Sequence, residues 1–170
     1  MSSDLNKITH EFPPVFDKNS KVLILGTIPS PKSRELGFYY MHPQNRFWKM
    51  ICEVLGVKIP PNINGRRELC LKHGIALWDV LESCEIKGAE DSSIANAVPN
   101  DLGRIITNGG CKIRKIFTTG KKAHALYQKF FRDLTQFPEE ICLPSTSPAN
   151  RTISEAEMLE EYRKIADFLK

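Results

Sequence analysis

The feature that most constrains this chain is a short uninterrupted apolar run, Val22-Leu23-Ile24-Leu25, which Gly26 ends. A run of this length without polar alternation is typical of a strand buried on both faces, as in a parallel sheet. Apolar runs at 75–81 and 141–143, and a segment at 112–118 that alternates apolar and basic residues, predict three more strands. Segments with helical patterns separate these runs. The alternation therefore predicts an α/β fold whose parallel sheet is covered by helices on both faces.

The remaining segments are expected to be helices and loops. Helices are predicted at 45–56, 64–73, about 101–108, 120–132 and 155–169. Asn100 or Asp101 can cap the third helix, and Ser154 with Glu157 is a capping box for the last. Residues 1–20 are expected to form a polar, loop-like N-terminal segment. Residues 82–99 are rich in loop-forming residues, so a loop is expected there. No repeat or linker divides the chain, so one domain is expected over residues 1–170.

Charge and cysteine usage set broad limits on function. The 170 residues carry a net charge of +4, which permits a nucleic-acid partner without requiring one. The five cysteines are scattered and form no C-x-x-C pair, which argues for buried thiols in a reducing compartment. No segment matches a signal peptide or a membrane span. We expect a cytoplasmic protein, nuclear if the source is eukaryotic, that makes no membrane contact.

The stretch from Phe38 to Trp48 concentrates aromatic rings together with a His, an Asn and an Arg. Such a mixture suits a site that stacks a flat ring and hydrogen-bonds its edge. Tyr39 and Tyr40 are the better stacking candidates, because Phe47 and Trp48 begin a helix and are expected in the core.

Two polar residues of the same stretch have more than one possible role. His42 can be a structural histidine or a ligand contact. Asn45 can cap the helix that follows it, bind a ligand, or do both, since a cap uses only part of the hydrogen-bonding capacity of the amide.

Two loops directly follow predicted strands. Gly26-Thr27-Ile28-Pro29-Ser30 can bring backbone N–H groups close to a ligand. Residues 144–151 combine two prolines with hydroxyl groups, an Asn and an Arg, which are suited to phosphate contacts. Each can also be an ordinary loop. Ligands of parallel sheets bind at the carboxyl ends of strands, where both loops and Asp79 fall. Asp79 is therefore either a site residue or part of a capped turn.

Several classes of site lack their signatures in this sequence. The first loop is not G-x-G-x-x-G and has no Walker lysine. The four histidines are widely separated with no H-x-x-x-H pair, so no metal is expected. No G-x-S-x-G elbow is present, which weakens a hydrolase-triad interpretation.

Taken together, these segments resemble the uracil-DNA glycosylase superfamily, most closely its hypoxanthine-DNA glycosylase branch. Three blocks carry the resemblance: Val22-Leu-Ile-Leu-Gly-Thr-Ile-Pro-Ser30, Tyr39-Tyr-Met-His-Pro-Gln-Asn-Arg-Phe-Trp48 and Leu143-Pro-Ser-Thr-Ser-Pro-Ala-Asn150. It implies a three-layer α/β/α fold with a central four-stranded parallel sheet. It also implies base excision repair of DNA containing a deaminated base, by cleavage of the N-glycosidic bond without metal or organic cofactor. The base must be flipped out of the stack to be reached.

The resemblance also suggests roles for particular residues. Superfamily members usually carry a catalytic Asp or Asn in the first loop, but here those positions hold Thr27, Ile28 and Ser30. In the hypoxanthine branch an Asn of the second block is thought to act instead, and it corresponds to Asn45. The second loop often carries a His, where this chain has Ser145 and Ser147. Both departures put uracil activity in doubt.

Asn45 is therefore the expected catalytic residue, positioning the attacking water. The residues expected to hold the base are Gly26, Thr27, Ile28, Pro29, Ser30, Tyr39, Tyr40, His42 and Asp79. Those expected to contact DNA are Ser145, Thr146, Ser147, Pro148, Ala149, Asn150 and Arg151.

Two other functions stay open at this point. A non-catalytic module that binds damaged DNA would bind a lesion without releasing the base. A nucleoside hydrolase would act on free nucleosides and show little salt-dependent DNA affinity. In each case we expect a monomer.

Overall fold

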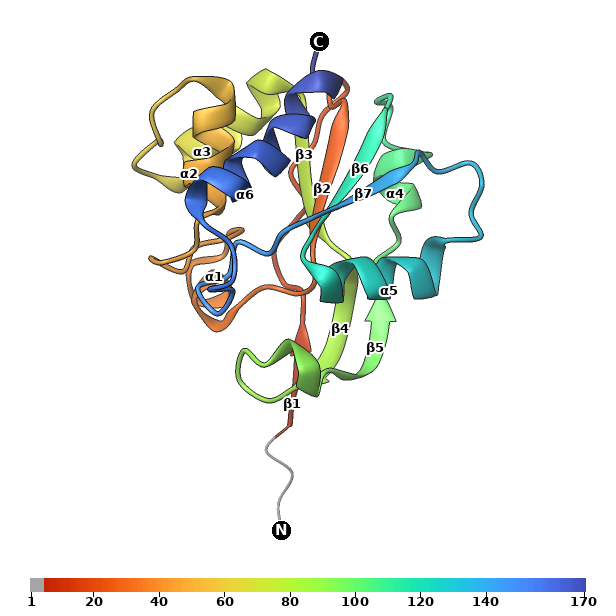
Figure 1. Cartoon of the computed structure of the whole chain (residues 1–170). Helices are drawn as coiled ribbons and strands as arrows, with labels where there is room; N and C mark the ends of the chain where they lie inside the picture. The colour runs from red at the N-terminus through yellow and green to blue at the C-terminus, as the bar shows by residue number, and fades with distance from the viewer. Residues whose placement is uncertain (1–4) are drawn as a thin grey trace.

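The computed structural model describes residues 5–170, and a four-stranded parallel sheet lies at its centre (Figure 1). The strands are β2 (Val22–Gly26), β3 (Ile75–Asp79), β6 (Lys115–Thr119) and β7 (Glu140–Leu143), in the order β3-β2-β6-β7. Every residue of β2 is buried, because neighbours pair with both of its edges and helices cover both of its faces. The predicted four-stranded parallel sheet is confirmed.

Helices cover both faces of this sheet (Figure 1). The helices α2 (Phe47–Leu55), α3 (Ile63–His73) and α6 (Glu155–Tyr162) lie on one side, with the 3₁₀ helix η2 (Arg163–Phe168) continuing α6. The helices α4 (Gly103–Ile106) and α5 (Lys121–Phe131) lie on the other side. Ser154 accepts a hydrogen bond from the Glu157 N–H at the start of α6, as the capping box predicted. The α/β/α fold class is therefore confirmed.

A second, antiparallel sheet was not predicted from the sequence. It consists of β1 (Asn6–Thr9), β4 (Leu81–Ile86) and β5 (Ala95–Pro99), in the order β1-β4-β5. The predictions of a loop-like lead over 1–20 and a loop over 82–99 are wrong for these strands, and residues 1–4 lie outside the described part. The strand β1 is mostly exposed and polar, and it is held by backbone pairing with β4. Such a strand has no apolar pattern by which a sequence could reveal it.

The passage from the first sheet to the second is almost direct. Val80 alone separates β3 from β4, and its N–H donates to the Gly26 carbonyl of β2 at 2.8 Å. Asn100 fixes the junction between β3 and β4, because its buried amide donates to the carbonyls of Asp79 (2.9 Å) and Leu81 (3.0 Å). Asn100 is therefore not a helix cap as predicted, and the short helix α4 has no side-chain cap.

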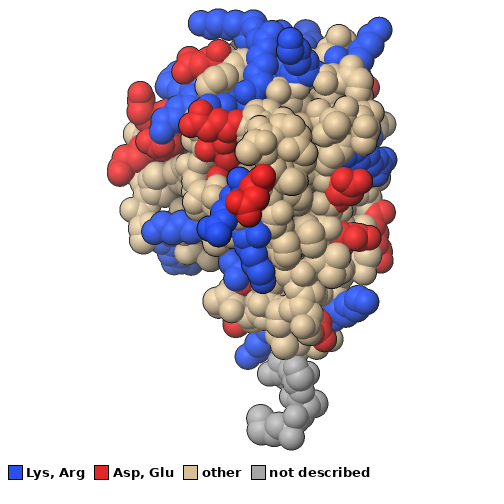
Figure 2. All heavy atoms as spheres, turned by 90° about the vertical axis from the view of Figure 1, so that its right-hand side faces the viewer, with Lys and Arg blue, Asp and Glu red and all other residues tan. Residues whose placement is uncertain are grey.

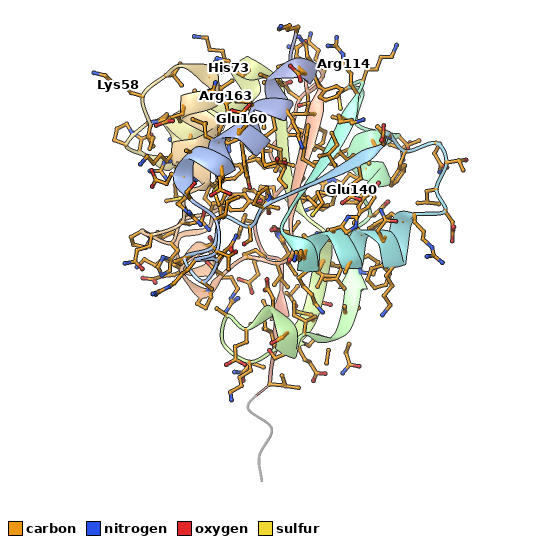
Figure 3. The ribbon with its side chains drawn as sticks, viewed as in Figure 1. Lys58, His73, Arg114, Glu140, Glu160 and Arg163 are labelled. Atoms are coloured by element: carbon orange, nitrogen blue, oxygen red, sulfur yellow. The ribbon has the colours of Figure 1, made fainter. Side chains whose placement is uncertain are left out.

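The last strand of the parallel sheet is tied to α5 by a buried carboxylate. The side chain of Glu140 is 3% exposed and accepts hydrogen bonds from Thr118 Oγ1 (2.5 Å) and Gln128 Nε2 (2.8 Å). His124 Nδ1 lies 2.7 Å from the same carboxylate. Figure 3 labels Glu140 between β7 and α5. These contacts hold β7 against α5 and so fix the point at which segment 144–151 begins.

The state of the cysteines and the character of the helices can be compared with what the sequence predicted. All five cysteines are free thiols, and Cys52, Cys70 and Cys84 are buried. Over residues 5–170, no helix has the length and apolar character needed to cross a bilayer.

Candidate active site

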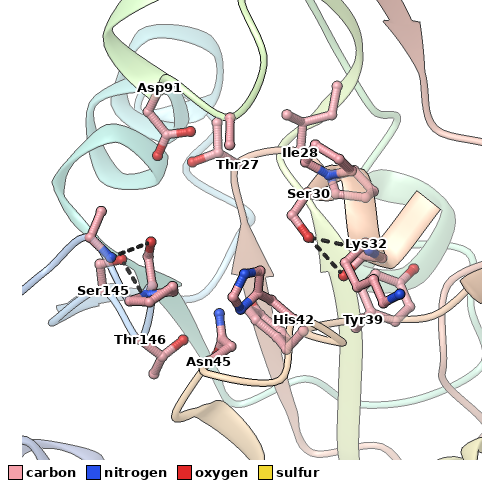
Figure 4. Close-up of a pocket in the computed structure, with 18 of the residues that line it drawn as sticks. Thr27, Ile28, Ser30, Lys32, Tyr39, His42, Asn45, Asp91, Ser145 and Thr146 are labelled. Atoms are coloured by element: carbon pink, nitrogen blue, oxygen red, sulfur yellow. Dashed lines mark hydrogen bonds between the residues drawn. The ribbon is translucent and has the colours of Figure 1, made fainter. Parts of the chain in front are cut away.

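A pocket of about 600 Å³ opens at the carboxyl ends of the parallel strands (Figure 4). Its volume is within the range of small-molecule sites. It is lined by most of the residues that the sequence singled out, namely Thr27, Ile28, Pro29, Ser30, Tyr39, Tyr40, His42, Asn45, Asp79 and Ser145 to Ala149. Segments that are far apart in the sequence therefore meet where ligands of parallel sheets bind. Gly26, Asn150 and Arg151 are not among the lining residues.

The pocket floor is built around Gly26. A Cβ atom at this position would lie 2.5 Å from Asp79 Oδ1 and 3.1 Å from the Tyr40 hydroxyl. Glycine is needed here because of this close approach. Tyr40 Oη lies 3.1 Å from Thr119 Oγ1, so three polar groups converge over the end of β2.

The carboxylate of Asp79 is buried and paired with a histidine that the sequence analysis did not assign to the site. Asp79 Oδ2 lies 2.8 Å from His10 Nε2, and the two side chains are 5% and 2% exposed. His10 follows β1 directly, and its N–H donates to the Glu82 carbonyl of β4 at 2.7 Å. Because 69 residues separate the two partners, no sequence motif joins them.

The two tyrosines have different environments. Tyr39 is 2% exposed, its hydroxyl donates to the Pro13 carbonyl at 3.0 Å, and its ring packs edge-on against Phe12. It therefore has little free ring surface, which counts against the expectation that it stacks on a base. Tyr40 is less buried than Tyr39, stacks on Phe47 with ring centroids 3.8 Å apart, and lines the pocket. Burial, with a contribution from the charge of Asp79, raises the pKa of Tyr40 well above its usual value, so this hydroxyl stays protonated.

Tyr40 has a backbone φ of +55°, in the left-handed region that few residues other than glycine adopt. Backbone strain of this kind clusters at ligand sites, where the surrounding structure maintains it. Here the stacking on Phe47 and the contact with Thr119 hold the ring in place.

Asn45 is anchored at one end of its side chain. Its Oδ1 accepts a hydrogen bond from the Phe47 N–H at 2.9 Å, at the start of α2. Its amide nitrogen is directed into the pocket beside His42 (Figure 4). The N-cap of α2 is Arg46 rather than Asn45, and Asn45 instead makes an Asx-turn contact to the first N–H of the helix. This contact leaves its Nδ2 group available to a ligand.

His42 presents one ring nitrogen as a donor. Its Nδ1 accepts a hydrogen bond from the Gln44 N–H at 3.1 Å. In the neutral ring the proton must therefore be on Nε2, which makes Nε2 a hydrogen-bond donor.

The first loop continues into the short helix α1 (Pro31–Leu36). Ser30 Oγ accepts from the Ser33 N–H, and Arg34 Nη1 donates to the Pro29 carbonyl at 2.8 Å, so the loop has a defined shape. Within residues 5–170, the backbone N–H groups of Ile28 and Ser30 have no hydrogen-bond partner. These two donors are available to a ligand in the pocket.

Segment 144–151 is joined to the Asn45 region by Arg46. The Arg46 N–H donates to the Thr146 carbonyl at 3.1 Å, and its guanidinium donates to the carbonyls of Asn150 and Ile153. Two residues that were predicted to contact DNA, Thr146 and Asn150, are instead largely engaged within segment 144–151. Thr146 is 2% exposed, and the Asn150 amide donates to the Ser145 carbonyl at 2.9 Å. The exposed residues of the segment are Ala149 and Arg151.

One wall of the pocket comes from the second sheet, which the sequence analysis did not predict. The segment that follows β4 contributes Gly88, Ala89 and Asp91. Asp91 lies across the pocket from Asn45 in Figure 4, and burial raises the pKa of its carboxyl, opposed by the nearby charge of Lys122. Asp91 is itself exposed, so it lies at the edge of the pocket.

Charge elsewhere on the protein is mixed. On the face shown in Figure 2, basic and acidic side chains are interspersed around a largely uncharged area. Among residues 5–170, no three His, Cys, Asp or Glu side chains are grouped as metal ligands would be.

Comparisons with known proteins point to one family. A family model described as the uracil DNA glycosylase superfamily matches residues 13–170. A protein of Methanosarcina acetivorans named hypoxanthine DNA glycosylase is 34% identical over 148 residues, which cover 86% of this chain and 91% of that protein. A protein of the same name from Methanosarcina barkeri is 33% identical over 82% of this chain and 87% of its own length. A solution NMR structure from M. acetivorans, assigned as a candidate uracil DNA glycosylase, has a TM-score of 0.72 and 30% identity, covering 91% of this chain and 96% of that one.

Proposed function

The chain belongs to the uracil DNA glycosylase superfamily and is a DNA glycosylase, and we propose that hypoxanthine is the base it prefers to release, ahead of uracil and xanthine. The proposed preference for hypoxanthine rests on the name hypoxanthine DNA glycosylase, which is shared by two relatives that match most of this chain. The composition of the first loop supports it, because Thr27, Ile28 and Ser30 stand where an Asp or Asn is usual in the superfamily.

In this proposal Asn45 is the catalytic residue. As the purine leaves with the bonding electrons, the sugar gains oxocarbenium character and is attacked by water. An amide is too weak a base to deprotonate that water fully, but it can position it. The Phe47 N–H fixes Asn45 Oδ1, and the second lone pair of Oδ1 and both Nδ2 hydrogens remain for the water and the sugar.

The departing base needs stabilisation of its negative charge. The unpaired N–H groups of Ile28 and Ser30 are suited to this, in the manner of an oxyanion hole. His42 can donate from Nε2 to the base edge or to a phosphate. The ring of Tyr40, which lines the pocket, is the proposed platform for stacking, an interaction worth about 1–3 kcal/mol.

The tip of segment 144–151 is proposed to enter the DNA. Pro148 and Ala149 line the pocket entrance, and Arg151 lies next to them in the chain. Inserted apolar side chains can occupy the space that a flipped base leaves, while an Arg can hold the phosphates. We further propose that the protein acts as a monomer.

The proposal is tested by single-turnover release of hypoxanthine, uracil or xanthine from otherwise identical DNA duplexes. We expect fastest release of hypoxanthine. Tight binding of all lesion duplexes without release of any base would indicate a damage-binding module. Release from free deoxyinosine but not from duplexes, at any salt concentration, would indicate a nucleoside hydrolase.

A further inference from the structure

Lys32 lies at the edge of the pocket, and we propose that its ammonium group binds the DNA phosphate next to the flipped nucleotide. In the free protein Glu35 holds this lysine, so a carboxylate and a phosphate compete for one cation. The inference goes beyond the proposed function, which gives the phosphate contacts to segment 144–151 and His42. It rests on the DNA glycosylase activity and is independent of which base is preferred.

The charges around the pocket make Lys32 unusual. Among the described residues that line the pocket, Lys32 is the only Lys or Arg, whereas Glu35, Asp79 and Asp91 are acidic. DNA carries a negative charge at every phosphate, so its backbone meets a site with more carboxylates than cations. The ammonium group of Lys32 is therefore the one charge by which the pocket lining itself attracts a phosphate.

The position of Lys32 follows from the first loop. Lys32 is the second residue of α1, which begins directly after Ser30. Figure 4 shows it on the side of the pocket that carries Ser30, across from Ser145. Segment 144–151, with the exposed Arg151, thus lies on the opposite side. A DNA strand that crosses the pocket mouth can be held on both sides of the flipped nucleotide.

The lysine is held loosely in the free protein. Its Nζ lies 3.3 Å from Glu35 Oε2, and the two side chains are 39% and 65% exposed. Exposed ion pairs of this kind contribute little to stability, because water and salt screen them. The flexible stem can therefore carry the ammonium group to a phosphate at small cost. Arg34, the other cation of α1, is less free, since its guanidinium donates to the Pro29 carbonyl.

Glu35 makes this contact selective. Its carboxylate engages Lys32 when no DNA is bound, and it repels a phosphate that comes near without replacing it. Flipping a nucleotide into the pocket brings its phosphate to the pocket mouth, where the lysine can change partners. The backbone of an undamaged duplex stays on the outer surface, so it gains much less from Lys32.

Equilibrium binding to DNA tests the proposal. The probe duplex contains one 2′-fluoroarabino nucleotide of hypoxanthine, whose fluorine disfavours the oxocarbenium character that base release requires. The comparison duplex carries adenine at the same position. The readout is the slope of log K against log salt concentration between about 50 and 200 mM, to which each phosphate contact contributes about 0.9. A loss of folded protein lowers the active concentration but does not change this slope.

Variants of the lysine have distinct expected results. Lys32→Gln should reduce the slope for the hypoxanthine duplex by about 0.9 and weaken binding about 3–10-fold at ~0.1 M salt. For the adenine duplex its slope should change by less than about 0.4. Lys32→Arg keeps the positive charge and should keep both slopes. Lys164→Gln is the matched control, because Lys164 has a similar exposure, pairs with Glu161 and lies outside the pocket lining.

Glu35→Gln tests the competition between carboxylate and phosphate. It should tighten binding of the hypoxanthine duplex by up to about fivefold, and this gain should shrink in the Lys32→Gln background. An equal gain in both backgrounds would overturn the role of Glu35.

Two results would overturn the role of Lys32 in a protein that releases bases normally. One is an unchanged slope in Lys32→Gln, and the other is an equal loss of slope for both duplexes. A wild-type protein that releases no base from hypoxanthine, uracil or xanthine duplexes would instead contradict the proposed function, and the inference with it.

Discussion

Arg46 Nη2 donates a hydrogen bond to the Asn150 carbonyl across 2.7 Å, which links the loop that carries Asn45 to segment 144–151. The same residue also donates through its backbone to Thr146 and through Nη1 to Ile153. A single residue, through its side chain and its backbone, therefore sets the position of segment 144–151 relative to Asn45.

Replacing this arginine should separate the two loops. We expect Arg46→Ala to lower the free energy of unfolding by about 1–3 kcal/mol, since the carbonyls of Asn150 and Ile153 lose a charged donor. Base release should slow further than this loss of stability explains, because the pocket is no longer closed on that side. Denaturant unfolding and single-turnover rates measure the two effects. Lys49→Ala, which removes an exposed ion pair with Glu155, is the control and should change stability by less than about 1 kcal/mol.

Two substitutions of Asn45 separate its structural contact from its chemistry. Asn45→Ala should slow base release by about 10²–10³-fold, as the loss of a group that stabilises a transition state does. It also removes the acceptor for the Phe47 N–H, which should cost about 1 kcal/mol of stability. Asn45→Asp keeps that acceptor, so its stability should match the wild type while its rate changes. Full activity of Asn45→Ala would show that catalysis depends on another residue.

Glu140 should be far more important for stability than its neighbour in the chain. Glu140→Gln leaves Thr118, His124 and Gln128 around a neutral amide, and we expect unfolding to become easier by about 1–3 kcal/mol. Glu139→Gln is the matched control, because the Glu139 side chain is 79% exposed and pairs only with Lys115. Thermal unfolding of both variants measures the difference. Equal effects would mean that the buried network adds nothing beyond a surface ion pair.

The carboxyl of Asp91 should make stability depend on pH in a particular direction. Partial desolvation at the pocket edge raises its pKa from the ordinary value of 3.8, although the residue is exposed, so folding slightly favours the protonated form. This contribution is fully present below the unfolded pKa and is lost as pH rises through the folded pKa. Asp91→Asn imitates the protonated form. Its melting temperature should therefore equal that of the wild type near about pH 3 and exceed it near about pH 7. A constant difference at both pH values would contradict the assigned cause.

The parallel sheet could be predicted because its strands are buried on both faces and so consist of apolar runs. Helix ends at Gly56 and Gly74 could be recognised for a similar reason, since both glycines adopt the left-handed conformation that ends a helix. Most pocket residues could be predicted because they directly follow strands of the parallel sheet. In each of these cases the physical cause is local in the sequence.

The features that escaped prediction depend on contacts between distant segments. The strand β1 is polar and is defined by its pairing with β4, which lies more than 70 residues away in the chain. His10 belongs to the pocket because Asp79 meets it there. Tyr39 has the composition of a stacking residue but is enclosed by Phe12 and Phe38. No periodicity distinguishes Tyr39 from Tyr40, because the two differ in backbone conformation: of the two, Tyr40 has the positive φ of +55°.

The nearly direct passage from β3 to β4 has a consequence for how this protein can be shortened. A chain trimmed to start at residue 13 would keep every motif on which family membership rests. It would nevertheless lose β1 and His10, and with them the outer edge of the second sheet and the partner of Asp79. Val80 alone separates β3 from β4. Loss of strand pairing in the second sheet would therefore disturb Asp79, the last residue of β3, which lies at the pocket. The boundary drawn by sequence similarity and the boundary of the cooperative folding unit are therefore different, and the eight residues between 5 and 12 lie in the gap.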